Sequence, residues 1–164
     1  MLYGMLAAFA ALIVVLDQFT KYLTVANLAL GEDFPVWPGM FHFTHLRNDG
    51  MSFSLLSGAR WFFVIVTIVV ILFALYAIYR RWIDHPMGIL SLAAVLGGAV
   101  GNLIDRIRFG YVVDMIEVEF VRFAVFNVAD MFVVVGGIVF MLYGLLFWKE
   151  PERPSKEDTN DPES

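Results

Sequence analysis

The 164-residue sequence contains no cysteine. This absence excludes disulfides, a thiolate nucleophile and metal sites built from thiolates. Charged residues are also scarce, because they make up 16% of the chain where a typical soluble domain has roughly 25%. Hydrophobic residues instead account for 60%. The two compositional features together predict an integral membrane protein.

The sequence also lacks any excess of basic residues. The formal net charge is −5. Residues 149–164 contribute −3 to it, since they hold three basic and six acidic side chains. This segment is polar and rich in proline, which predicts a disordered acidic tail on the cytoplasmic side. The remaining balance of charge gives no reason to expect nucleic-acid binding.

Four apolar stretches are long enough to cross a bilayer, which requires about 20 mostly apolar residues. They predict transmembrane helices at about residues 3–25, 61–80, 86–104 and 130–148, within one domain over residues 1–148. The first stretch has the alternative of a cleaved signal peptide. It lacks a basic leading region, and its apolar character resumes after Lys21, so a retained helix is favoured.

Four spans place both termini on one side of the membrane and the segments 26–60 and 105–129 on the other. Several polar residues at the ends of the spans must then meet at one membrane face: Asp17, Lys21, Asn102, Asp105, Arg106, Asn127 and Asp130. Basic residues divide almost evenly between the two sides, so their count does not decide the orientation. The Arg80–Arg81 pair and Lys149 favour cytoplasmic termini.

Two short segments outside the spans alternate with the two-residue period of strands: "FHFTHL" at 41–46 and "MIEVEF" at 115–120. The expected fold is therefore an all-α membrane protein with four transmembrane helices and a small extracytoplasmic β-sheet at the membrane surface. His42 and His45 are three apart in the first segment, so they face opposite ways and do not form a metal pair.

Asp114 and Asp130 are the candidate catalytic residues. Two aspartates brought together near a low-dielectric boundary cannot both ionise easily and share a proton. One can then deprotonate a water while the other polarises the scissile carbonyl. The alternative is that Asp114 is a solvated loop acid and Asp130 only an N-cap.

Other polar and small residues allow more than one interpretation. Asp17 and Lys21 lie four apart on one helix face and form either a neutralised polar patch or a proton or ion relay. Asp105 and Arg106 are adjacent, so on a helix they need separate partners. The spacing Gly97-x-x-x-Gly101 predicts close packing of membrane helices, and Gly136–Gly137 offers a similar patch.

Five motifs occur in order along the chain: "DQFTK" (17–21), "RNDGMSF" (47–53), "GGAVGNLIDR" (97–106), "VVD" (112–114) and "FNVAD" (126–130). With these motifs and four spans, the sequence resembles the lipoprotein signal peptidase family, also called signal peptidase II. The resemblance implies a membrane aspartic endopeptidase that cleaves bacterial prolipoproteins before the diacylglyceryl-modified cysteine. It also implies an active site at the outer face of the cytoplasmic membrane, with cytoplasmic termini.

The same resemblance implies a catalytic pair at Asp114 and Asp130. It implies supporting or substrate-binding roles for Asp17, Lys21, Asn48, Asn102, Asp105, Arg106 and Asn127. No metal or organic cofactor is expected, and the expected partners are lipid-modified prolipoproteins and membrane lipid, with a monomeric enzyme. Met51–Ser52 and Met115 depart from the family pattern, and we expect these changes to alter the pocket shape only.

A proton- or ion-coupled transporter is the alternative function, because intramembrane carboxylates also serve as relays. A transporter is expected to carry polar residues through the middle of its spans and often has internal repeats. The span centres here are apolar, and the sequence contains no repeat. A purely structural subunit would leave the two aspartates without a role.

Overall fold

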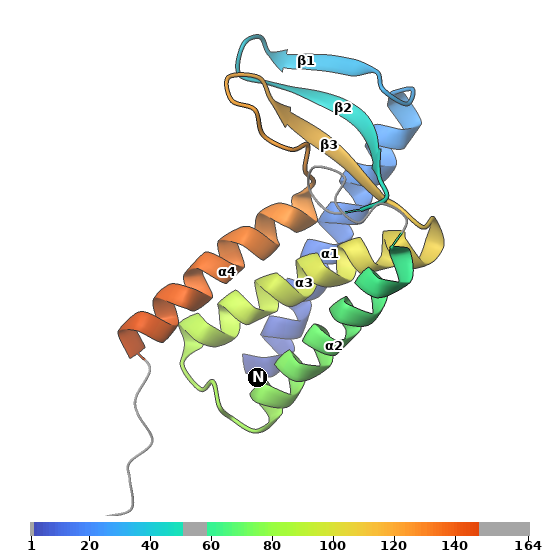
Figure 1. Cartoon of the computed structure of the whole chain (residues 1–164). Coiled ribbons are helices and arrows are strands. Elements are labelled where there is room, and N and C mark those ends of the chain that lie inside the picture. The colour runs from blue at the N-terminus through green and yellow to red at the C-terminus, as the bar shows by residue number, and fades with distance from the viewer. Residues whose placement is uncertain (1, 51–58, 148–164) are drawn as a thin grey trace, which may run out of the picture.

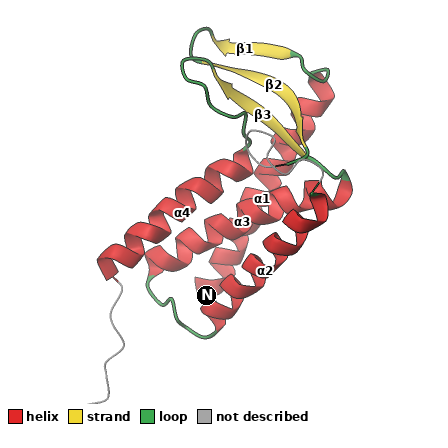
Figure 2. Cartoon of the chain, in the orientation of Figure 1, coloured by secondary structure: helices red, strands yellow, loops and turns green. Residues whose placement is uncertain are grey.

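The computed structural model describes residues 2–50 and 59–147. It contains helices and strands in the order α1 (Leu2–Asn27), β1 (Asp33–Trp37), β2 (Phe41–Asn48), α2 (Arg60–Tyr79), α3 (Pro86–Arg108), β3 (Val112–Val118) and α4 (Val128–Phe147). The predictions for Met51–Ser52 and for the tail at 149–164 lie outside the described residues. Figure 2 shows the helices gathered in a bundle and the strands at one end of it.

All four helices are long and apolar enough to cross a membrane. The predicted fold class of four spans with a small sheet is therefore confirmed. The chain is a multi-pass membrane protein.

Helix α3 is the centre of the bundle. In its most apolar stretch, 61% of the residues are buried. In the corresponding stretches of α1, α2 and α4 the buried share is only 11–17%. Figure 1 shows α3 between α2 and α4, with α1 behind it. Because α3 is surrounded by protein and the other helices face outward, α3 can carry polar residues that lipid would not accept.

Glycines allow this close packing. A Cβ on Gly97 would lie 2.9 Å from the backbone oxygen of Ala10 on α1, and one on Gly98 would collide with the backbone oxygen of Ala129 on α4. Gly136 of α4 approaches α3 in the same way, since a Cβ there would lie 2.9 Å from a backbone oxygen. The packing role predicted for Gly137 is wrong, because a Cβ at that position meets open space.

Helices α1 and α3 extend further than the sequence predicts, to Asn27 and Arg108 instead of about 25 and 104. The hydrophobic runs end earlier because polar residues follow them. In α3, Asp105 binds Lys21 and Gln18 inside the bundle, and the helix continues. In α1, Asn27 Nδ2 donates to the backbone oxygen of Leu23 in the last turn. As predicted from the span count, the end of α1, the start of α2, the end of α3 and the start of α4 meet at the end of the bundle that carries the sheet (Figure 1).

The sheet has the order β1-β2-β3, with both pairs antiparallel. Strand β2 contains the first segment predicted from alternation, 41–46. Strand β3 begins and ends earlier than the second predicted segment and covers only its residues 115–118. Strand β1 was not predicted, because "DFPVW" contains an aspartate and a proline, which strands disfavour. The whole sheet lies over the ends of α1 and α4 (Figure 1).

The two faces of the sheet differ in polarity. Phe34 pairs with Phe43, and Phe43 pairs with Ile116, so one face presents apolar side chains from all three strands. On the other face His42 pairs with Glu117, and its Nε2 lies 3.2 Å from the Glu117 carboxylate. The sheet is therefore amphipathic, like a structure at an interface between lipid and water.

Candidate active site

The polar residues named from the sequence gather where the helices end beneath the sheet. They come from five elements that are far apart in the chain, namely α1, β2, α3, β3 and α4. All nine predicted site residues are described, and hydrogen bonds, ion pairs or a shared cavity connect them: Asp17, Lys21, Asn48, Asn102, Asp105, Arg106, Asp114, Asn127 and Asp130.

Asp114 lies in β3 and is 1% exposed. Its Oδ1 accepts a hydrogen bond of 2.7 Å from Asn127 Nδ2, and its Oδ2 accepts one of 2.9 Å from Asn48 Nδ2. The interpretation of Asp114 as a solvated loop acid is therefore wrong. Its strand is fixed on the α3 side as well, because the backbone N–H of Val113 donates to Asp105.

Asp130 lies in the first turn of α4, and its Oδ1 accepts a hydrogen bond of 2.7 Å from Asn102 Nδ2. Asn127 immediately precedes the helix and exchanges two hydrogen bonds with Asp130. The Asp130 backbone N–H donates to Asn127 Oδ1 at 2.9 Å, and the Asn127 backbone N–H donates to Asp130 Oδ2 at 3.2 Å. This reciprocal pattern is that of a capping box, in which Asn127 is the cap and Asp130 is the third helical residue.

Two buried asparagines connect the aspartates. Asn102 Oδ1 accepts hydrogen bonds from Lys21 Nζ at 2.9 Å and from Asn127 Nδ2 at 3.1 Å. Since its oxygen faces two donors, the Nδ2 of Asn102 must point to Asp130. Asn127 in turn directs its Nδ2 to Asp114. The asparagines thus fix the positions of both carboxylates without adding charge.

Lys21 is the buried cation of the site, with 4% of its side chain exposed. Its Nζ lies 2.8 Å from Asp17 and 3.0 Å from Asp105. Asp17 also accepts a hydrogen bond of 2.9 Å from the backbone N–H of Ala129 in α4. The predicted Asp17–Lys21 pair is therefore confirmed, and it joins α1 to α3 and α4 beneath the catalytic candidates.

Gln18 is a site residue that the sequence analysis missed. Its Nε2 donates to Asp105 Oδ1 at 2.9 Å and to the backbone oxygen of Gly101 at 3.2 Å. The available signal was its position within "DQFTK", next to Asp17. As predicted, Arg106 and Asp105 have different partners. The guanidinium of Arg106 lies 5.3 Å from the ring centroid of Phe63, whereas Asp105 binds Lys21.

Asp114 and Asp130 open into one cavity of about 480 Å³. Asn48, Asn102 and Arg106 line its polar part. Its apolar part consists of Val112 of β3 and of residues from the segment before α4 and the first turns of α4: Phe123, Ala124, Val125, Phe126, Met131, Val133, Val134 and Val135. An occupant would therefore meet two carboxylates at one side and an apolar wall at the other.

Burial raises the pKa of Asp114 to about 6. The hydrogen bond from Asn48 opposes this rise, and the negative charge of Asp130 adds to it. The charge of Asp130 therefore favours the protonated form of Asp114, as a shared proton requires.

Among the residues that the structure describes, Asp33, His42 and Glu117 place possible metal ligands within 4.8 Å of one another. They lie on the charged face of the sheet and not in the cavity of Asp114 and Asp130.

Comparisons with known proteins agree with this arrangement. The family model described as signal peptidase (SPase) II matches residues 9–147. A lipoprotein signal peptidase of Enterococcus faecalis (strain ATCC 700802 / V583) is 44% identical over 151 residues, which cover 92% of this chain and 91% of the relative. The lipoprotein signal peptidase of Streptococcus pyogenes serotype M1 is 43% identical over 141 residues, covering 86% and 91% of the two chains.

Two solved structures described as a bacterial membrane enzyme share the fold. The first, at 2.3 Å resolution, has a TM-score of 0.82 and 31% identity, and the match covers 92% of this chain and 94% of that one. The second, at 1.9 Å resolution, has a TM-score of 0.80 and 32% identity, with coverage of 88% and 94%. The match with the family model and the identity to these relatives extend over nearly the whole bundle and sheet, and so the chain belongs to the signal peptidase II family of lipoprotein-processing peptidases.

Proposed function

We propose that this protein is an aspartic endopeptidase that removes the signal peptide from diacylglyceryl-modified prolipoproteins, with Asp114 and Asp130 as its catalytic pair. The observation that carries the proposal is the opening of the buried Asp114 and the half-buried Asp130 into one cavity. Each is fixed by amide donors, which is the preorganisation that acid–base catalysis requires.

In the proposed reaction the dyad holds one proton, which we place on Asp114 because its pKa is raised to about 6. Asp130 takes a proton from water as the water oxygen attacks the scissile carbonyl carbon. Asp114 donates its proton to the carbonyl oxygen, which gives a neutral tetrahedral diol. The proton on Asp130 then passes to the leaving nitrogen as the C–N bond breaks, and Asp114 regains its proton from the collapsing diol.

The apolar lining of the cavity fits a signal peptide as substrate. Its apolar wall includes Val133, Val134 and Val135 of α4, a helix with the length and composition of a membrane span. A signal peptide is itself an apolar segment, so it can lie along this helix with the scissile bond near Asp130. The lipid on the adjacent cysteine stays within the membrane.

Relay transport is disfavoured by the distribution of charge. The charged side chains of the four spans all lie in the halves nearest the sheet: Asp17, Lys21, Arg60, Asp105, Arg106, Arg108 and Asp130. A relay would need such groups along the whole path. Chemistry at one membrane face agrees better with this distribution, and we place that face outside the cytoplasm with the termini inside.

The proposed activity is tested with the purified chain in lipid or detergent micelles and a diacylglyceryl-modified prolipoprotein. Mass spectrometry of the products should show one cut, immediately before the modified cysteine. The matched control is the same precursor without the diacylglyceryl group, which we expect to be cut at least tenfold more slowly. If the authentic precursor stays intact, the peptidase assignment is wrong and ion transport becomes the function to assay.

A further inference from the structure

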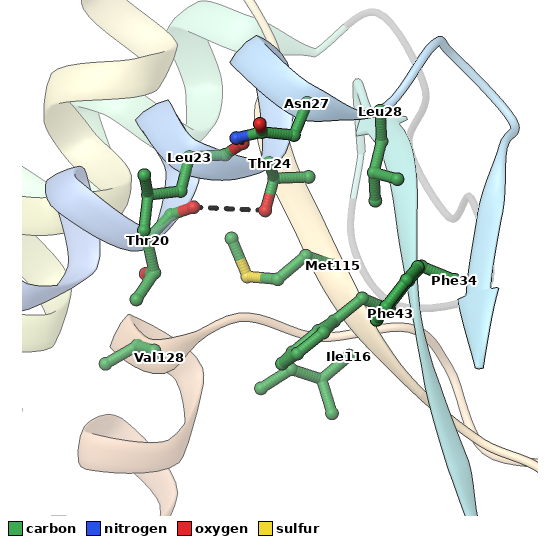
Figure 3. Close-up of a pocket in the computed structure, with 10 residues that line it drawn as sticks. All are labelled: Thr20, Leu23, Thr24, Asn27, Leu28, Phe34, Phe43, Met115, Ile116 and Val128. Atoms are coloured by element: carbon green, nitrogen blue, oxygen red, sulfur yellow. Dashed lines mark hydrogen bonds between the residues drawn. The ribbon is translucent and has the colours of Figure 1, made fainter. Parts of the chain in front are cut away.

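A second cavity lies beneath the apolar face of the sheet and has no place in the proposed reaction. We call it the α1 groove. It encloses about 470 Å³ and is lined by Thr20, Leu23, Thr24, Asn27, Leu28, Phe34, Phe43, Met115, Ile116 and Val128 (Figure 3). Its volume lies within the ~300–1,000 Å³ of typical small-ligand sites.

The polar side chains of the α1 groove have partners within α1. Thr20 Oγ1 donates to the backbone oxygen of Asp17, Thr24 Oγ1 to that of Thr20, and Asn27 Nδ2 to that of Leu23. The rest of the lining is apolar, with aromatic rings from β1 and β2. The groove therefore offers its occupant almost only dispersion contacts.

The α1 groove borders a helix that is long and apolar enough to cross a membrane. Its wall from Thr20 to Asn27 belongs to the membrane-spanning stretch of α1. On the face of the sheet away from the groove lie Asp33, His42 and Glu117. Leu23, Phe34 and Phe43 line the groove and are still 41%, 58% and 38% exposed, so the groove is open to the acyl chains around the protein.

The α1 groove is separate from the catalytic cavity. Of the residues that line the two cavities, none is shared. Asp114 and Met115 are neighbours in β3, at a place where the strand is irregular, because the backbone N–H groups of Met115 and Ile116 both donate to the Phe126 carbonyl oxygen. Asp114 opens to the catalytic cavity and Met115 to the α1 groove.

From these observations we propose that the α1 groove holds one acyl chain of a membrane phospholipid. The acyl chain enters from the leaflet on the side of the sheet and fills the space between the end of α1 and the apolar face of the sheet. Without it, this space is either empty or filled by water, and both leave the apolar lining without contacts. The bound acyl chain packs on Met115 and so supports β3, the strand that carries Asp114. This inference does not depend on the proposed function.

The test uses the full-length protein in detergent micelles with phosphatidylcholine that carries a photoreactive diazirine in one acyl chain. After irradiation and digestion, mass spectrometry locates the label. We expect saturable labelling of Met115, Ile116 or the Thr20–Leu28 segment, which excess unlabelled phosphatidylcholine removes. General labelling of the lipid-facing helices should not saturate.

Two groove-filling variants, Ile116→Trp and Leu23→Trp, are each expected to reduce the saturable labelling at least fivefold. The matched control is Ile65→Trp, an equally bulky change at a 59% exposed isoleucine on α2. This control should leave the saturable labelling unchanged. Labelling that does not saturate, or that persists in both groove variants, would overturn the proposal. Displacement by a diacylglyceryl-modified substrate peptide would also overturn it, because the groove would then belong to the substrate.

Discussion

Three asparagines determine the geometry of the two aspartates. Asn48, Asn102 and Asn127 all donate side-chain N–H groups to Asp114 or Asp130. An amide donates without carrying charge, so it can hold a carboxylate in place without forming an ion pair that would keep it permanently ionised. A dyad that must gain and lose a proton needs partners of this kind.

The first prediction concerns Asn48→Ala. The hydrogen bond from Asn48 lowers the pKa of Asp114, so its removal raises that pKa further. If protonated Asp114 is the acid, kcat/KM of the parent falls as pH rises through about 6. In the variant this alkaline fall moves to higher pH, and the maximum activity decreases. The measurement is the pH profile of prolipoprotein cleavage for both proteins.

Thermal unfolding over the same pH range shows whether the Asn48→Ala protein stays folded. A profile whose midpoint stays where the parent has it, or moves to lower pH, would contradict the assignment of the proton to Asp114.

The second prediction concerns Lys21→Met. This change leaves Asp17 and Asp105 as buried carboxylates without their cation, which costs about 3–5 kcal/mol in comparable cases. We expect a loss of thermal stability and of activity, measured by unfolding in micelles and by cleavage. The double variant Lys21→Met/Asp17→Asn removes one of the unpaired charges and should recover part of the stability. No recovery would show that Lys21 acts through something other than this charge balance.

Part of this site could be predicted from the sequence. The pairs Asp17–Lys21 and Asn127–Asp130 are local in the chain, so helix geometry gives them directly. The contacts of Gln18 with Asp105 and of Asp17 with the Ala129 backbone join different helices. No single-sequence pattern specifies which helix faces which, so these contacts required the fold.

At the scale of the elements, α3 supports the site because it touches every other helix at close range. Gly101 shows how little space is left, since a Cβ there would lie 2.6 Å from the Asp17 carboxylate. The sequence predicted the close approach from the Gly97–Gly101 spacing. It could not show that Gly101 makes room for a buried carboxylate.

The third prediction compares Gly101→Ala with Gly137→Ala. The first forces Asp17 away from its position beside Lys21, and overpacking of this kind costs about 1–3 kcal/mol. The second places a methyl group in open space in the middle of α4, and because alanine is favoured over glycine there it should raise the free energy of unfolding by up to about 1 kcal/mol. Thermal unfolding and cleavage rates test both. Equal behaviour of the two variants would contradict the packing account.

The ends of the elements were the least predictable part of the fold. Hydropathy ends α3 near residue 104 because Asp105 and Arg106 follow, but Asp105 is paired inside the bundle and the helix continues. Strand β1 was likewise not predicted from the sequence, and only its pairing with β2 in the structure identifies it. It exists because β2 has a free edge for it, in spite of the proline at position 35.

The charged residues within the spans and the sheet lie at the same end of the molecule, so its orientation in the membrane decides where the reaction occurs. The basic residues on the two sides are nearly equal in number, so their count does not decide the orientation. The Arg80–Arg81 pair, Lys149 and the family resemblance all favour an active site outside the cytoplasm.

The fourth prediction tests this orientation and uses the absence of native cysteine. Single cysteines are introduced by Asp33→Cys in the sheet and by Asp84→Cys in the connection between α2 and α3. In intact cells a membrane-impermeant maleimide should label the first variant and leave the second unlabelled until the membrane is opened. The reverse pattern would place the site in the cytoplasm.

The most direct test of the catalytic pair compares the parent with Asp114→Asn and Asp130→Asn on a diacylglyceryl-modified prolipoprotein. Folding of all three is checked by thermal unfolding. Removal of a general acid or base usually costs ~10²–10⁴ in rate, and we predict a loss of about 10³ or more for each variant with the fold retained. A folded variant that cleaves at nearly the parent rate would show that its aspartate is structural, and the mechanism would have to be rebuilt around Asp17 or Asp105.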